Sequence, residues 1–211
     1  MDPVLLQALA CVVLGYLAGS LPMGVIVARL TGATDPRTVG SGRTGGTNAL
    51  RAMGLPRAVL VAVLDLGKGF VPILLVGAAG APPIVAALTA LAAVVGAWKS
   101  VFLRFHGGRG VATGVGGMAA VSVWVVLIGL PVFVGTIALT RYVSLGSLLG
   151  TLAGTIASAG FVVLGWLDPA WLAYTVGGTA IVWLAHRDNI GRLLAGTERK
   201  VGRAGTPPPA A

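Results

Sequence analysis

Six long apolar stretches, joined by shorter segments rich in glycine and charge, dominate the pattern of this sequence. They are Val4–Leu30, Leu55–Ala79, Pro82–Trp98, Val111–Leu139, Val143–Trp166 and Pro169–Ala185. A helix needs about 20 predominantly apolar residues to cross a hydrocarbon core of about 30 Å. Each stretch is therefore a candidate crossing, and the pattern predicts an all-α integral membrane protein.

Composition supports this fold class and excludes a soluble globular domain. Of the 211 residues, 56% are hydrophobic and 10% are charged, whereas soluble domains average about 25% charged residues. The first apolar stretch is too long for a cleaved signal peptide, so we expect it to remain as the first helix. We expect residues 1–201 to form a single membrane domain and the Pro- and Ala-rich residues 202–211 to be a disordered tail.

The basic residues gather in three of the connections between the apolar stretches. They are Arg29, Arg37, Arg43, Arg51 and Arg57 around the first connection, Lys99, Arg104 and Arg109 after the third stretch, and Arg187, Arg192, Arg199, Lys200 and Arg203 after the last. The connection Ala78–Pro83 carries no charge, and Trp166–Ala170 carries only Asp168. Because basic loops stay on the cytoplasmic side, the three basic connections are predicted to be cytoplasmic.

Six crossings do not fit this charge distribution, because they would leave the basic C-terminus outside. Dividing Val111–Leu139 into a hairpin at Gly129-Leu130-Pro131 removes the conflict, since proline ends or kinks a helix. The prediction is therefore seven transmembrane helices, with an external N-terminus and a cytoplasmic C-terminus. The fourth and fifth would be short, partial or tilted, and five spans is the main alternative.

Two glycine-rich connections are candidate phosphate sites. The first is Gly40-Ser41-Gly42-Arg43-Thr44-Gly45-Gly46-Thr47-Asn48, followed by Arg51, with a helix expected to begin at Asn48. The second is Phe105-His106-Gly107-Gly108-Arg109-Gly110, before a helix that begins near Val111. Glycines allow positive φ and let backbone N–H groups converge on an anion, especially where a helix starts. The alternatives are a plain flexible loop and a basic loop that serves only topology, but two such loops on one face favour a shared anionic ligand.

Three further groups carry candidate chemistry. Arg141 precedes the segment with Ser144 and Ser147, and its alternative role is an anchor to lipid phosphates. His186 and Asn189 lie three apart and would share a helical face. Within the same segment, Asp188 and Arg192 could form an ordinary surface ion pair. Asp65 and Lys68, inside an apolar stretch, are either functional or a mutual ion pair.

Together these motifs resemble the bacterial acyl-phosphate:glycerol-3-phosphate acyltransferase family. The match runs in order through Gly19–Gly24, Gly40–Asn48, Asp65–Gly69, Gly107–Thr113, Arg141–Ser147 and His186–Glu198, over nearly the whole chain. The resemblance implies a seven-helix enzyme of the bacterial inner membrane with a cytoplasmic active site. Such an enzyme transfers a fatty acyl group from acyl phosphate to the 1-hydroxyl of glycerol 3-phosphate, giving lysophosphatidic acid and phosphate.

The resemblance also assigns roles to single residues. Catalytic roles are expected for Ser41, Thr47, Asn48, Arg109, Ser144, His186 and Asn189. Substrate-binding roles are expected for Gly40, Gly42, Gly45, Gly46, Arg51, Lys68, His106, Gly107, Gly108, Gly110, Arg141 and Ser147. The first loop and Arg109 would hold acyl phosphate, whereas Arg51, Ser144, His186 and Asn189 would hold the acceptor.

No metal, cofactor or nucleic acid is expected, and the sequence has no Cys/His cluster and no His-x-x-x-x-Asp signature. The expected partners are the two substrates and membrane lipid, and we expect a monomer. An acyl phosphate already has a good leaving group, so binding and orientation could suffice without an acyl-enzyme.

Some positions depart from the family pattern. Arg43 and Gly46 stand where asparagine and alanine are usual, and Ala97 stands where histidine is usual. His106 and Arg109 replace two lysines. A divergent member with a different acceptor or no activity is therefore one alternative. An anion transporter is the other, although no internal repeat supports it.

Overall fold

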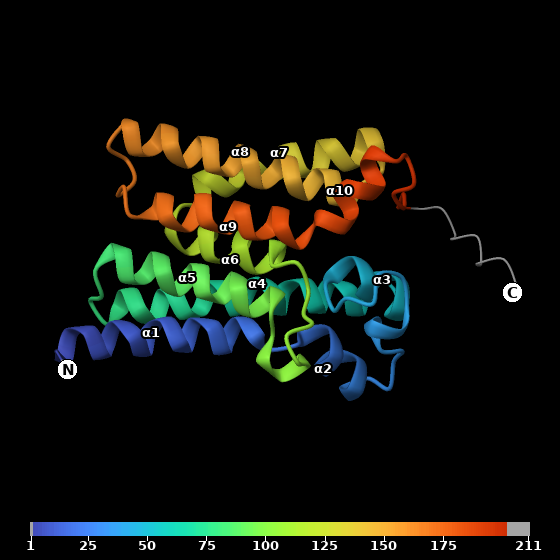
Figure 1. Cartoon of the computed structure of the whole chain (residues 1–211), viewed down its shortest axis with the longest axis horizontal. Helices are drawn as coiled ribbons and strands as arrows, with labels where there is room; N and C mark the ends of the chain where they lie inside the picture. The colour runs from blue at the N-terminus through green and yellow to red at the C-terminus, as the bar shows by residue number, and fades with distance from the viewer. Residues whose placement is uncertain (1, 202–211) are drawn as a thin grey trace, which may run out of the picture.

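The structure is a computed structural model that describes residues 2–201, and these residues form a bundle of helices (Figure 1). Met1 and the predicted tail at 202–211 lie outside the described residues. The elements in chain order are α1 (Pro3–Ser20), α2 (Met23–Leu30), η1 (Pro36–Thr38), α3 (Gly46–Met53), α4 (Leu55–Ala78), α5 (Pro83–Trp98), η2 (Val101–Leu103), α6 (Val111–Val121), α7 (Val123–Thr140), α8 (Val143–Val163), α9 (Trp171–Ala185) and α10 (Arg187–Leu194). The prediction of an all-α protein is confirmed.

The helices that are long and apolar enough to cross a membrane number four among the described residues. They are α4, the segment Pro83–Leu103 that contains α5, α7 and α8. The first apolar stretch forms a fifth candidate, α1 and α2, which are bent by 46° at Leu21-Pro22. Helices α6 and α9 are apolar but shorter.

The predicted hairpin break at Gly129-Leu130-Pro131 is wrong. The chain breaks instead at Ser122, which is extended with φ −151° and ψ 102° between α6 and α7. Pro131 lies inside α7. Membrane helices tolerate a proline when neighbouring groups satisfy the backbone groups that lose their hydrogen bonds. Gly129 is used for packing, because a Cβ there would lie 3.0 Å from the carbonyl oxygen of Gly150 on α8.

Glycine also brings other helix pairs close together. Cβ atoms at Gly15 and Gly19 of α1 would overlap the backbone of α5 at Thr89 and Ala93. In the same way, Gly69 of α4 meets Thr113 of α6. Small residues allow such backbone approach where lipid supplies no hydrophobic driving force between helices.

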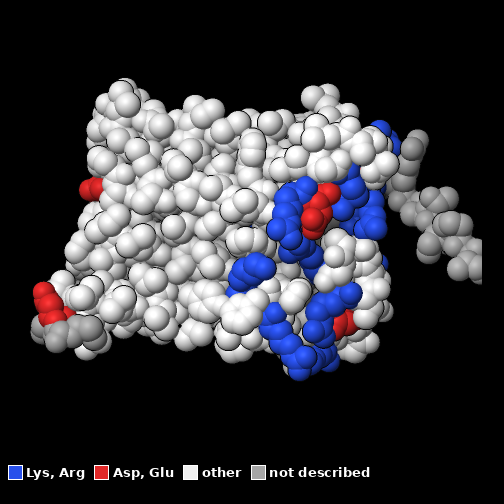
Figure 2. All heavy atoms as spheres, in the orientation of Figure 1, with Lys and Arg blue, Asp and Glu red and all other residues white. Residues whose placement is uncertain are grey.

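The surface separates into an apolar belt and a charged end. Large apolar side chains are exposed along α1, α4, α7 and α8, as expected for helices that face lipid. Nearly all Lys and Arg on the visible face gather at the end of the bundle that holds α2, α3 and α10 (Figure 2). The two glycine-rich loops lie at this end, together with His186 and Asn189 at the start of α10.

Candidate active site

The first glycine loop, Gly40–Asn48, is a turn whose backbone is held by one side chain. Gly40 and Gly42 have positive φ of 58° and 68°, which confirms the predicted backbone freedom. The Asn48 side chain is buried and donates to the carbonyl oxygens of Pro36 (3.1 Å), Val39 (2.9 Å) and Arg43 (3.0 Å). Its Oδ1 accepts from Ser41 N at 3.3 Å and Arg51 Nη1 at 3.1 Å. Asn48 is therefore occupied in shaping the loop.

Helix α3 begins at Gly46, two residues before the predicted start at Asn48. Gly45 is its N-cap in an extended conformation, and its carbonyl accepts the amides of Asn48 and Ala49. A Cβ at Gly45 would meet no atom within 4 Å. The first turn of α3 therefore presents its free N–H groups and the positive end of its dipole beside open space, which suits an anion.

The second glycine loop, Phe105–Gly110, packs directly on the first. Gly108 N donates to Ala97 O at 2.8 Å, which fixes the loop against the end of α5. Arg43 Nη1 donates to Gly108 O at 3.2 Å, and a Cβ at Gly108 would lie 3.8 Å from Gly45 N. The two loops predicted to share an anion thus lie side by side, and Arg43 joins them.

Arg109 is the residue after Gly108 and lies where the loops meet α10. Its Nε is buried with no hydrogen-bond partner among the described residues. Burial, and then the charge of Arg43, lower the pKa of Arg109 to about 10, so the guanidinium remains charged at neutral pH. A buried, charged donor without a partner is costly. It points to an anionic ligand that completes it.

His186 is the residue between α9 and α10 and caps the start of α10, Asn189 lies in the first turn of α10, and both are buried. His186 Nδ1 lies 2.8 Å from Val182 O, and because a carbonyl only accepts, Nδ1 carries the proton and Nε2 is an acceptor. Burial, and then the charge of Arg109, lower the pKa of His186 to about 4. The ring is therefore neutral at pH 7.

A carboxylate that the sequence analysis missed organises this side of the site. Glu198 accepts from Ser144 Oγ at 2.9 Å, Asn189 Nδ2 at 2.6 Å and Arg192 Nε at 2.7 Å. We call these four residues the carboxylate cluster. Burial acts to raise the pKa of Glu198, but the hydrogen bonds, first from Asn189, outweigh it and lower the pKa below its ordinary value. Asn189 Oδ1 stays buried without a partner among residues 2–201.

The cluster changes one ion pair considered from sequence. Arg192 pairs with Glu198 rather than with Asp188. Asp188 instead lies 3.7 Å from Arg43 Nη2, which links α10 to the first glycine loop. A single acidic residue in a basic segment gives little sequence signal, because its partners Ser144 and Asn189 are 54 and 9 residues away.

The remaining predicted substrate ligands divide between the site and other places. Arg51 contacts Asn48 in the first loop, and burial, followed by the charge of Arg199, lowers its pKa. Arg141 has φ 63° at the end of α7, and its carbonyl accepts from Val201 N at 2.9 Å.

Three of the predicted ligands bind groups that lie close to them in the chain. Lys68 is paired with Asp65, with Nζ 2.8 Å from Oδ1, as the ion-pair alternative expected. Ser147 Oγ donates to Val143 O within α8. His106 Nδ1 lies 2.6 Å from Arg104 O in its own loop.

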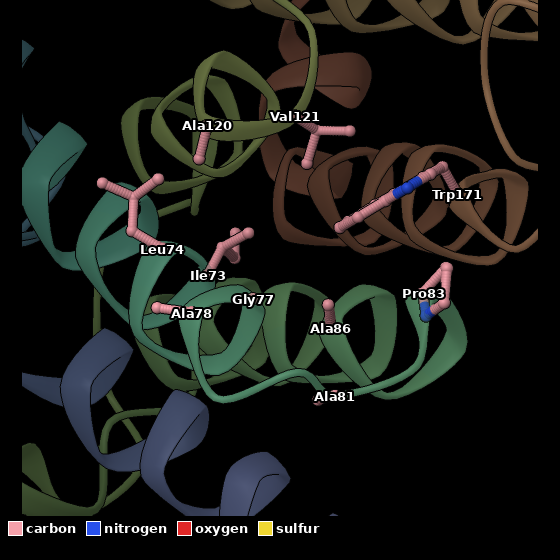
Figure 3. A pocket seen from close by; sticks show the side chains of 10 residues that line it. All are labelled: Ile73, Leu74, Gly77, Ala78, Ala81, Pro83, Ala86, Ala120, Val121 and Trp171. Carbon is pink, nitrogen blue, oxygen red and sulfur yellow. The ribbon is translucent and has the colours of Figure 1, made fainter.

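A cavity of about 400 Å³ lies at the other end of the bundle, next to the α4–α5 connection (Figure 3). Its lining is apolar and includes Ile73, Ala86, Val121 and Trp171 from four helices. It contains no residue of the glycine loops or the carboxylate cluster. Within residues 2–201 no group of three His, Cys, Asp or Glu side chains could hold a metal ion.

Comparison with known proteins gives the same family as the motifs. The family model described as glycerol-3-phosphate acyltransferase matches residues 9–196. Glycerol-3-phosphate acyltransferase of Anaeromyxobacter dehalogenans strain 2CP-C is 46% identical over 206 residues, which covers 95% of this chain and all of that protein. The Rubrobacter xylanophilus enzyme of the same name is 46% identical over 198 residues, with 90% and 94% covered.

The fold agrees as well. The crystal structure of PlsY (YgiH), described as an integral membrane glycerol 3-phosphate acyltransferase in its glycerol 3-phosphate form, matches with a TM-score of 0.84 and 39% identity, covering 93% of this chain and 96% of that one. A second PlsY structure, in a lysophosphatidic acid form, gives 0.82 and 36%. Family model, relatives and fold all cover most of the chain, and the chain belongs to the glycerol-3-phosphate acyltransferase family.

Proposed function

We propose that this protein transfers a fatty acyl group from acyl phosphate to the 1-hydroxyl of glycerol 3-phosphate. The relatives named above are glycerol-3-phosphate acyltransferases, and the PlsY structures are described with glycerol 3-phosphate and lysophosphatidic acid forms. The observation that carries the proposal for this chain is the pair of unpartnered buried atoms, Arg109 Nε and Asn189 Oδ1, at the junction of the loops and α10. One is a cationic donor suited to phosphate, and the other is an acceptor suited to a hydroxyl.

In this proposal the two glycine loops hold the donor. The N–H groups at the start of α3 and the Arg109 guanidinium would bind the phosphate of acyl phosphate. Arg109 stabilises the charge that grows on this phosphate as its bond to the acyl carbon breaks. Ser41 and Thr47 would complete the cradle from the same loop.

The acceptor would lie against α10 and the start of α8. Ser144, His186 and Asn189 would position glycerol 3-phosphate, with Arg51 as a further cation. The 1-hydroxyl oxygen attacks the acyl carbon, the carbon–oxygen bond to phosphate breaks, and the hydroxyl proton leaves with the phosphate. His186 is a weak base because its pKa is about 4, so the departing phosphate is the better proton acceptor. Its role is then to orient the hydroxyl through Nε2.

The experiment is an assay of the detergent-purified protein with acyl phosphate and glycerol 3-phosphate. Lysophosphatidic acid and inorganic phosphate should appear in equal amounts, and Arg109→Gln should abolish both. Arg187→Ala is the matched control, because this neighbouring cation has an 82% exposed side chain and should leave turnover unchanged. Release of phosphate without lysophosphatidic acid would instead support a different acceptor, and no reaction with either substrate would contradict the proposal.

We also propose the topology: seven membrane segments, with the N-terminus external and both loops and α10 at the cytoplasmic face of the bacterial inner membrane, acting as a monomer. The charge asymmetry in Figure 2 supports it. Single cysteines at positions 141, 168 and 200, in a Cys11→Ser background, should react with an impermeant thiol reagent on intact cells only at 168. Strong labelling at 141 or 200 with none at 168 would contradict this orientation.

A further inference from the structure

The bend between α1 and α2 interrupts the regular backbone hydrogen bonding inside an apolar stretch. Helix α1 ends at Ser20, where Leu21 N donates back to Ala18 O at 3.2 Å and Leu21 O accepts Met23 N at 3.0 Å. Pro22 cannot donate because it has no N–H. The two helices meet at 46°. Few backbone donors are therefore left to brace the bend, and donors from elsewhere in the chain can add to them.

Two side chains from other elements add hydrogen bonds to the carbonyls of the bend. Ser100 Oγ, at the start of η2, donates to Ser20 O at 2.6 Å. Lys68 Nζ, on α4, donates to Leu21 O at 3.0 Å and lies 2.8 Å from Asp65 Oδ1. The Lys68 and Asp65 side chains are only 7% and 12% exposed. A cation at the C-terminal end of a helix is also favoured by the helix dipole.

Helix α2 connects this bend to the first glycine loop. It starts at Met23, and Gly24 packs so closely on the loop that a Cβ there would overlap Thr44 O. Thr44 immediately precedes Gly45, the N-cap of α3. A Cβ at Gly108 of the second loop would lie 3.7 Å from Thr44 Oγ1. The direction of α2 therefore decides where the two loops meet.

We propose that Lys68 is a positioning residue of this enzyme. Its ammonium, oriented by Asp65, holds the end of α1, sets the angle of α2 and so fixes the first glycine loop. Lys68 acts through this loop and does not touch substrate, in contrast to the ligand role expected from sequence. The proposal rests on the proposed function only where it treats that loop as the donor cradle.

Hydrogen exchange of the substrate-free protein tests this role without reference to catalysis. Lys68→Met alone would leave a buried carboxylate unpaired, so the test variant is Asp65→Asn/Lys68→Met. Losing a hydrogen bond to a charged donor should speed exchange of amides in residues 38–48 by about tenfold or more. Amides of α7 and α8 should exchange as in the parent. Asp65→Asn alone keeps the bond from Lys68 to Leu21 O and should speed exchange in the loop less. Lys68→Arg should keep most of the loop's protection from exchange.

Steady-state kinetics complete the test. In the double variant kcat should fall about tenfold or more, while KM for glycerol 3-phosphate stays near the parent value. Faster exchange in all helices alike would reduce Lys68 to a general stability role and overturn the proposal. Unchanged loop exchange with a raised KM for acyl phosphate would make Lys68 a substrate ligand and also overturn it. If the loop loosens but turnover stays normal, Lys68 has no role in the reaction and that claim is overturned. Loss of activity in Gly45→Leu would then show that the loop still serves as the donor site, so the failure would concern Lys68 alone.

Discussion

The first glycine loop and the carboxylate cluster, the two sides of the proposed site, are each organised by one side chain but with different chemistry. In the loop, the neutral amide of Asn48 binds three carbonyls and two donors. In the cluster, the charged Glu198 gathers one hydroxyl, one amide and one guanidinium. An amide does not titrate, whereas a carboxylate does. The donor side should therefore depend on shape and the acceptor side on charge.

The largest effect is expected where shape is disturbed, at Gly45→Leu. The space beside Gly45 is open, so the leucine can be accommodated by the fold, but it would fill the place where a phosphate reaches the first turn of α3. Turnover should fall by at least about 100-fold, because small displacements at a reacting centre cost that much. Steady-state kinetics and thermal unfolding measure it. Gly160→Leu is the control, since Gly160 also has open space and lies far along α8. Near-normal activity of Gly45→Leu would remove the loop from the donor site.

The acceptor side is tested next by His186→Ala and Asn189→Ala. In the proposed site each change would remove a hydrogen bond to a charged ligand, which corresponds to a loss of roughly 10- to 150-fold, mostly as a raised KM for glycerol 3-phosphate. Asn189 also binds Glu198, so Glu198→Gln is the comparison. If Glu198→Gln reproduces the whole effect of Asn189→Ala, Asn189 acts by holding the cluster rather than the acceptor. If the losses fall on the KM for acyl phosphate, the two sides have been assigned in the wrong order.

These residues show how far the sequence could be read. The apolar stretches, the glycine loops and the pair His186 and Asn189 were visible because each is local in the chain. The break at Ser122 was not, because it depends on α6 packing on α4 while α7 packs on α8. Gly129 and Pro131 looked like a turn, but Gly129 serves close helix packing. Glu198 was missed for the same reason, since only the fold brings it to Ser144.

Acid should weaken the acceptor side while it spares the loop. The pKa of Glu198 is lowered, so its contribution is present above the unfolded value and is lost as pH falls through the folded one. The pKa of His186 is about 4 in the fold against 6.5 unfolded. Between these values the folded state binds fewer protons, so stability falls as pH falls. At pH 5 the titration of His186 alone lowers the free energy of unfolding by about 2 kcal/mol relative to neutral pH.

Thermal unfolding in detergent at pH 7.5 and pH 5 measures this dependence. The fall in Tm should be clearly smaller in His186→Gln than in the parent, because glutamine does not titrate. Asn48 variants should keep the full pH dependence even if their Tm is lower at both values. An equal fall in His186→Gln and in the parent would place the acid sensitivity elsewhere.

The smallest effect is expected at Arg43, the residue that joins the two sides and departs from the family pattern. Its Nη1 reaches Gly108 O at 3.2 Å, and its Nη2 lies 3.7 Å from Asp188, whose side chain is 54% exposed. Arg43→Asn restores the usual residue, but asparagine is too short for either contact. One hydrogen bond from a charged donor contributes about 1.5 kcal/mol at the low end, or about tenfold in turnover, and the exposed ion pair adds little. Its charge also lowers the pKa of Arg109, but Arg109 is protonated at pH 7 with or without it. Arg43→Lys keeps a compact cation, so its turnover should lie between those of the parent and Arg43→Asn. Turnover equal to the parent in Arg43→Asn would mean that the packing of Gly108 beside Gly45 and its bond to Ala97 hold the loops in place without Arg43. A loss above about 100-fold would make Arg43 a ligand of the substrate phosphate rather than a link between the loops.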